Sequence, residues 1–265
     1  MNGKLGVALA IAWLGAILVF ALLAPLLSTH DPLQPVAAPL TGPSLSMPLG
    51  SDALGRDVWS RLAYGARLTL AAATLSTTLT VVIGSVLGLA AAASGGWTDR
   101  TIVAAANAAL AIPGLVLAML IVAAIGPSLT AVVLAVGLGA APGFARLART
   151  TFLQVREKAY VTASGALGAG RLWRARHHLL PNAWPSLASL TTTHFAWALL
   201  GITTLTFLGL AGDPSLPEWG AMLNSGRQHL IDTPRLALLP GLAIALTVLA
   251  VHRLGDRSAA GGSSG

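Results

Sequence analysis

The chain has 265 residues, of which 55% are hydrophobic and only 9% are charged, whereas soluble domains carry about 25% charged residues. The net charge is +7, but the basic residues neither form one run nor alternate with aromatic side chains, which disfavours nucleic-acid binding. Because the chain has no cysteine, disulfides and thiolate metal sites are excluded. Long apolar runs predict an all-α, polytopic membrane protein.

The first predicted element, residues 1–27, is an apolar run that follows Lys4. At about 1.5 Å per residue it is long enough to cross about 30 Å of hydrocarbon. We interpret it as a retained transmembrane helix, since the apolar core of a cleavable signal peptide is shorter.

The second predicted region, residues 28–66, begins with several prolines and is therefore expected to be extended and irregular. It ends in GRDVWSRLAYGAR, where Val58, Trp59 and Leu62 alternate with charged residues. This pattern predicts a short interfacial helix.

The third region, residues 67–256, is predicted to hold five more spans, which brings the total to six transmembrane helices. These spans cover about 67–94, 100–125, 128–150, 183–210 and 234–254. Residues 257–265 are interpreted as a tail, and its last residues, GGSSG, resemble a cloning remnant.

The distribution of Lys and Arg predicts the orientation. If the N-terminus is inside, one side of the membrane holds Lys4, Arg100, Arg146, Arg149, Arg156, Lys158, Arg171, Arg174, Arg176, Arg253 and Arg257. The other side holds Arg56, Arg61, Arg67, Arg227 and Arg235. Because the first side holds more Lys and Arg residues, it is predicted to be cytoplasmic. The N- and C-termini and the loop between the fourth and fifth spans are then cytoplasmic.

Two features of the sequence indicate which energy source could drive transport by this chain. None of the acidic residues lies inside a span, and His194 is the only comparable group there, which disfavours a proton-coupled carrier. Neither Lys4 nor Lys158 fits a phosphate-binding loop, so we expect no catalytic residues and no bound cofactor in this chain. Energy for uphill transport would have to come from another polypeptide.

The loop 156–181 is the compact basic segment of the chain. Glu157 to Leu167 predicts a helix, Gly168 and Gly170 end it, Arg171 to Leu180 predicts a second helix, and Pro181 opens the next span. Small residues on this helical bracket would let another protein approach closely. A basic loop that lies on anionic lipid is the alternative.

Polar residues elsewhere indicate two further candidate sites. Candidates for the translocation pathway are Asn107, Thr192, Thr193, His194, Thr203, Thr204 and Thr206, although threonines also bond their own helix backbone. Candidates for an outer contact with a partner are Arg56, Asp57, Glu218, Trp219 and Arg227, although these also suit solvated loops. No metal-ligating set is predicted.

Several stretches in order resemble the second (C-type) permease of the dipeptide/oligopeptide/nickel group of bacterial ABC importers, over residues 49–256. They are LGSDALGRDVWSRLAYGARLTL, REKAYVTASGALGAG, HLLPNAWPSL, LTFLGLAG and EWGAMLNSGRQHLIDTPRLALLPGLAIALTVLA. The resemblance implies a type I importer permease fold in the bacterial inner membrane. It also implies transport of short peptides by alternating access, with nickel, a metal chelate or haem as alternative cargo.

The resemblance further implies the partners: a homologous first-type permease, two ATPase domains that bind ATP and Mg, an extracytoplasmic binding protein, and the lipid membrane. The loop becomes a coupling helix that docks on an ATPase. The expected coupling residues are Glu157, Tyr160, Thr162, Ala163, Ser164, Gly168, Arg171, Arg174 and Pro181. An ion-coupled carrier and a non-transporting scaffold stay open as interpretations of another class.

Two positions depart from the pattern of that group. The usual Glu-Ala-Ala start of the loop motif reads Thr162-Ala163-Ser164 here, so the acid at its first position is absent. Ile202 stands where many relatives carry an acid in the fifth span. We therefore transfer no role of these two acids to this chain.

Overall fold

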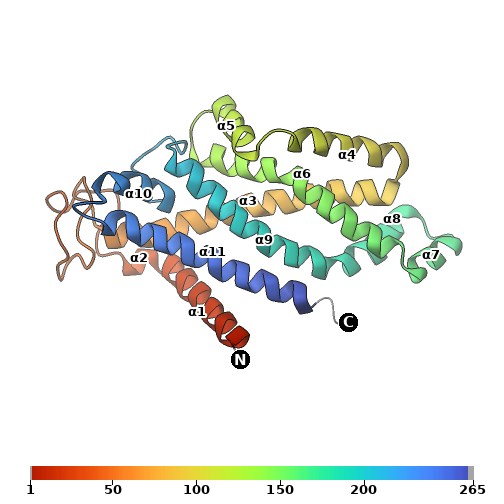
Figure 1. Ribbon diagram of the computed structural model, residues 1–265, viewed down its shortest axis with the longest axis horizontal. Helices are drawn as coiled ribbons and strands as arrows, with labels where there is room; N and C mark the ends of the chain where they lie inside the picture. Colours follow the sequence, from red (N-terminus) through yellow and green to blue (C-terminus); the bar gives the residue numbers. More distant parts are fainter. Residues whose placement is uncertain (1, 262–265) are drawn as a thin grey trace.

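The computed structural model describes residues 2–261, which fold mainly into helices joined by loops. The long helices run roughly along the long axis of the molecule (Figure 1): α1 (Asn2–Leu22), α3 (Val58–Ser94), α6 (Leu129–Arg156), α9 (Leu180–Phe207) and α11 (Arg235–Gly261). The shorter elements are α2 (Ala24–Leu27), α4 (Gly96–Leu110), α5 (Gly114–Ile125), α7 (Ala159–Ala166), α8 (Arg171–Arg174), the π-helical turn η1 (Ala175–Leu179), α10 (Trp219–Gly226) and the 3₁₀ turn η2 (Arg227–His229).

Four of the described helices, α1, α3, α6 and α11, are long and apolar enough to cross a membrane. Helices α4 and α5 make a fifth span only if they count as one broken span, because they are bent by 90° at the break before Pro113. Helix α9 has 28 residues, enough to cross, but its threonines and His194 make it more polar. The six expected spans thus correspond to five helices and one bent pair.

The start of α3 differs from the sequence prediction. The stretch from Val58 to Ala66 is not a separate interfacial helix but the first turns of α3, which continues for 37 residues. Asp57 begins the helix, since its carboxylate accepts hydrogen bonds from the backbone N–H groups of Trp59 and Ser60. The prediction failed because these charged side chains are buried among other segments and do not face a membrane surface.

The C-terminal tail also differs in part. Helix α11 continues to Gly261, so residues 257–261 are helical, whereas 262–265, the last part of the predicted remnant, lie outside the described residues.

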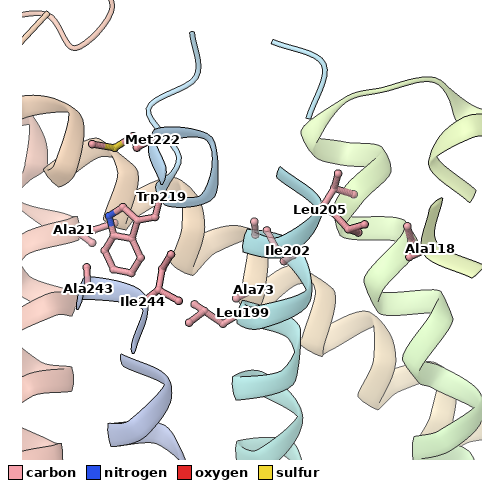
Figure 2. Packing of buried hydrophobic residues seen from close by; sticks show 14 of the residues in the cluster. Ala21, Ala73, Ala118, Leu199, Ile202, Leu205, Trp219, Met222, Ala243 and Ile244 are labelled. Atoms are coloured by element: carbon pink, nitrogen blue, oxygen red, sulfur yellow. The ribbon is translucent and has the colours of Figure 1, made fainter. Parts of the chain in front are cut away.

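The main apolar core joins α1, α3, α5, α6, α9, α10 and α11. Figure 2 shows Trp219 of α10 close to Ala21, Ala243 and Ile244, with Leu199 and Ile202 on the neighbouring α9. Trp219 is the largest fully buried side chain among the described residues. The short helix α10 is therefore anchored in the bundle.

A second apolar cluster binds the segment after α6 to the bundle. It joins Phe144 and Phe152 of α6 with Val161 of α7, Leu179 of η1 and Leu187 of α9. Val161 is only 1% exposed, so α7 packs against the rest of the protein through this side chain.

Candidate functional site

The bundle has two different ends (Figure 1). Helices α7 and α8, within residues 156–181, form one end, which we call the loop end. Residues 28–57 and α10 form the opposite end, which we call the cap end.

At the loop end, the helical bracket begins later than the sequence predicts. Glu157 is the C-cap of α6, with its N–H donating to Leu153 O at 3.1 Å, and α7 begins at Ala159. Glu157 therefore ends one helix and does not stabilise the start of the next. On α7, Tyr160, Thr162 and Ala163 are exposed, whereas Ser164 is half-buried and donates to Val161 O at 2.7 Å.

Gly168 makes the turn between α7 and α8. Its φ of +92° lies in the left-handed region, and a Cβ there would meet no atom within 4 Å. Glycine is required at this position by backbone conformation and not by lack of space. Gly170, two residues later, is equally open but has a φ of −65°.

The second predicted helix of the bracket is not a separate element. Helix α8 passes through η1 directly into α9, and Pro181, which has no N–H to donate, lies in the first turn of α9 just after the π-helical turn. A displacement of α8 is therefore transmitted along a continuous helical backbone into α9. Arg171 is exposed, while Arg174 is half-buried. The Nε atom of Arg174 is buried and has no hydrogen-bond partner among the described residues.

Aromatic rings tie the two halves of the bracket together. Tyr160 of α7 lies edge-on to His178 of η1, with ring centroids 5.5 Å apart. Trp173 stacks on His177 at 4.6 Å and meets His178 edge-on at 5.2 Å. Sequence reasoning missed this cluster of Trp173, His177 and His178, because only the turn at Gly168 brings His178 beside Tyr160.

At the cap end, most of the expected outer-contact residues are inside the protein. Arg56 is 4% exposed, and Asp57, Glu218 and Trp219 are fully buried. Only Arg227 is exposed, with its guanidinium carbon 5.1 Å from the ring centroid of Phe207. The prediction of an outer contact is therefore wrong for the four buried residues, whose polar atoms have partners within the chain.

The first set of these partners surrounds Glu218. One carboxylate oxygen accepts a hydrogen bond from Thr69 Oγ1 at 2.9 Å, and the other accepts from Ala221 N at 3.0 Å, which caps α10. Trp219 donates its backbone N–H to Thr69 Oγ1 and its ring N–H to Leu62 O. These bonds fasten α10 to α3.

The second set is built on arginines. Arg56 Nε lies 2.8 Å from Asp52 Oδ2, and Arg61 Nε lies 3.4 Å from the same oxygen. Arg61 also donates to Pro32 O at 2.9 Å and to Ser215 O at 3.1 Å. Buried guanidinium groups thus join residues 28–57 to the loop that precedes α10.

The loop before α10 carries an exposed acid at its surface. The hydroxyl and backbone N–H of Ser215 donate to Asp213 and, with Arg56 and Arg61 nearby, hold the pKa of its carboxyl below the usual value of 3.8. This carboxylate stays charged at any physiological pH.

The expected pathway residues do not form one site. Thr203 is buried and donates to Leu199 O of its own helix, so its side chain does not reach the surface of this chain and the prediction is wrong for it. Thr206 is also buried and donates to Thr203 O, but it lines a cavity of about 430 Å³ at the cap end, beside Asp213 and Asn224. Thr204 lines a cavity of about 480 Å³ between α5, α6 and α9.

The remaining pathway candidates lie apart. Thr192, Thr193 and His194 are half-buried in α9, where His194 meets Phe144 edge-on at 5.0 Å. Asn107 lines a different cavity, between α4 and α6.

The fold is that of the membrane subunit of an ABC transporter. The structure resembles the MetNI methionine ABC transporter in inward-facing conformations, with a TM-score of 0.57 and 23% identity over 75% of this chain and 96% of that chain. A second crystal form gives a TM-score of 0.59 at 24% identity, over 74% of this chain and 93% of that chain. The expected all-α fold of a type I importer permease is confirmed.

Sequence relatives define the family. Residues 84–260 match the family described as binding-protein-dependent transport system inner membrane component. The chain is 39% identical over 215 residues to the glutathione transport system permease protein GsiD of Pectobacterium atrosepticum, covering 81% of this chain and 71% of that protein. The same protein of Escherichia coli O6:K15:H31 is 38% identical over the same coverage.

The chain therefore belongs to the family of binding-protein-dependent transport system inner membrane components and is a permease of an ABC importer. The expected membership of the peptide-type group is confirmed.

Proposed function

We propose that this permease forms half of a translocation pathway for short peptides. The cargo class is supported by the two relatives described above, which are named for transport of glutathione, a tripeptide. The cavity beside Thr204, Trp197 and Leu200 of α9 is a suitable part of the pathway wall, because it is open to the surface of this chain and mostly apolar.

In this proposal the second half of the pathway is a homologous permease of the first type. Two ATPase domains bind ATP and Mg and perform all hydrolysis, and an extracytoplasmic binding protein delivers the cargo. The N- and C-termini and the loop end face the cytoplasm, since eleven of sixteen Lys and Arg residues lie on that side of the predicted topology.

The observation that carries the mechanism is the continuity of α8, η1 and α9 behind an exposed α7. In the proposed cycle, Tyr160, Thr162 and Ala163 contact an ATPase, and closure of the two ATPases on ATP moves the loop end. The aromatic contacts to His178 pass this movement to η1, and from there α9 carries it into the pathway. Alternating access follows from rotation of α9 against α5 and α6.

The experiment compares two glycines of the loop. Gly168→Ala should reduce peptide uptake per ATP hydrolysed in reconstituted complexes, because alanine at a φ of +92° costs about 1–2 kcal/mol and shifts the turn. Strain of that size changes a conformational equilibrium by a factor of about 5–30.

Gly170→Ala is the matched control, since that site is equally open and has an ordinary φ. It should keep the normal ratio of uptake to hydrolysis. Equal coupling in both variants would argue against a transmitting role for this turn.

A further inference from the structure

One cavity of the described chain is not used by the proposed transport mechanism. It has a volume of about 460 Å³ and lies between α4 and α6, where it is lined by Val103, Asn107, Leu110, Gly143, Arg146, Leu147, Arg149 and Thr150. Figure 1 shows α4 beside α6 at the edge of the bundle, and α4 packs against α3 and α6.

The two arginines of this cavity have different partners. Arg149 is held by Asp99 of α4 through two hydrogen bonds, Nε to Oδ1 at 2.5 Å and Nη2 to Oδ2 at 2.6 Å, so its charge is compensated. Arg146 is exposed, and no acid lies within salt-bridge distance of its guanidinium among the described residues. The cavity therefore carries one uncompensated positive charge.

The polar groups around that charge supply hydrogen-bond donors that suit an anion. Arg146 offers five N–H donors, and the side-chain amide of Asn107 offers two more. Thr150 gives its hydroxyl hydrogen to Arg146 O at 3.1 Å, so it adds no further donor. A phosphate group fits this donor set, because an arginine fork binds its oxygens in pairs.

The remaining walls are apolar and partly exposed. Leu110 is 43% exposed and Leu147 is 44% exposed, and both line the same cavity as Arg146. A ligand that covers these side chains and neutralises Arg146 at once has an anionic head and a hydrocarbon tail. Basic pockets between transmembrane helices bind phospholipid headgroups in this way.

We propose that the cavity between α4 and α6 binds one anionic phospholipid, with its phosphate at Arg146 and Asn107 and an acyl chain along Leu110 and Leu147. The bound lipid holds α4 against α6 beside the ion pair of Asp99 with Arg149. This site is independent of the identity of the cargo.

The first test measures lipid-dependent stability of the complete complex in nanodiscs. Replacing part of the phosphatidylcholine by phosphatidylglycerol should raise the melting temperature of the wild-type complex. Arg146→Gln should remove most of this rise, and Asn107→Leu should reduce it. Arg253→Gln, an exposed arginine of α11 outside the cavity, should keep the full rise. Because each variant is compared with itself in two lipids, a general loss of stability does not obscure the result.

The second test identifies the occupant directly. A photoreactive benzoylphenylalanine in place of Leu147 should form an adduct with phosphatidylglycerol in the assembled complex. An adduct with another polypeptide only, or an unchanged phosphatidylglycerol effect in Arg146→Gln, would overturn the proposal. So would equal protection by inorganic phosphate in detergent without lipid, because the ligand would then be a free anion.

Discussion

At the scale of single residues, the cap end depends on buried charged groups that form hydrogen bonds within the chain. Glu218 has no exposed surface, yet both of its oxygens accept hydrogen bonds, from Thr69 and from the N–H of Ala221. A buried polar group that keeps its partners costs little, whereas one that loses a partner costs about 1–3 kcal/mol. These residues are therefore structural, and their mutation should lower stability before it affects recognition.

The pair of Glu218 and Thr69 gives a stability prediction. Glu218→Ala and Thr69→Val should each lower the free energy of unfolding by about 1–3 kcal/mol, because each leaves a buried group without its partner. The double variant should lose less than the sum, since the two residues share one hydrogen bond. Unfolding in mixed detergent micelles measures all three.

Glu157→Ala is the control for this cycle. Glu157 is exposed at the end of α6, so its removal should change stability by less than about 0.5 kcal/mol. Strictly additive losses at Glu218 and Thr69 would show that the two side chains do not interact.

Gly220 gives a second prediction at this scale. A Cβ at this glycine would overlap Thr206 Oγ1 and the backbone oxygen of Thr203, so α10 and α9 approach as closely as they do only without a side chain. Gly220→Ala should therefore destabilise the permease by about 1–3 kcal/mol, measured by thermal unfolding.

Two further variants complete this measurement. Thr206→Ala in addition should restore only part of the loss, because the clash with the backbone of Thr203 remains. Gly15→Ala in α1, where nothing lies within 4 Å, should be neutral or slightly stabilising. A Gly220→Ala variant as stable as Gly15→Ala would contradict the close contact.

At the scale of elements, the bracket of α7 and α8 is a docked unit and not a free loop. Val161 packs against Phe152 and Leu179, while the opposite face of α7 is exposed. An element that transmits force must be firmly attached to the part it moves. The second apolar cluster and the aromatic contacts of Tyr160 provide that attachment.

Val161 gives the prediction for this element. Val161→Ala should weaken the docking of α7 by about 1–3 kcal/mol, since it removes buried apolar surface and leaves a void. Amide hydrogen exchange in residues 158–168 should become faster, while exchange in the core of α6 stays unchanged.

The matched control is Leu167→Ala, because Leu167 is 89% exposed in the same loop. Its exchange pattern should equal that of the wild type. Unaltered protection of α7 in Val161→Ala would mean that this residue does not hold the helix in place.

At the scale of the whole molecule, the sequence predicted the helical class and the position of the loop well. Long apolar runs define spans locally, and the turn at Gly168 is signalled by a residue that tolerates a positive φ. Both features are properties of short stretches, so no knowledge of distant contacts is needed. The bend between α4 and α5 was indicated only by Pro113 within the expected third span.

The same reasoning failed where distant segments meet. Thr69 and Glu218 are 149 residues apart, and Arg61 and Ser215 are 154 residues apart. In the sequence, Glu218 looks like a surface charge because its partner Thr69 is far along the chain. The threonines of α9 were ambiguous for a related reason, since helix periodicity does not show which face is covered by α10.

The central claim is that the exposed face of α7 contacts a partner ATPase. The chain has no cysteine, so Ala163→Cys provides a single attachment site for a photoreactive benzophenone on that face, and Leu54→Cys provides the control at the cap end. In complete complexes in membranes, we expect an adduct with the ATPase from position 163 and none from position 54. Adducts with lipid alone from position 163, while the ATPase is bound, would contradict the account.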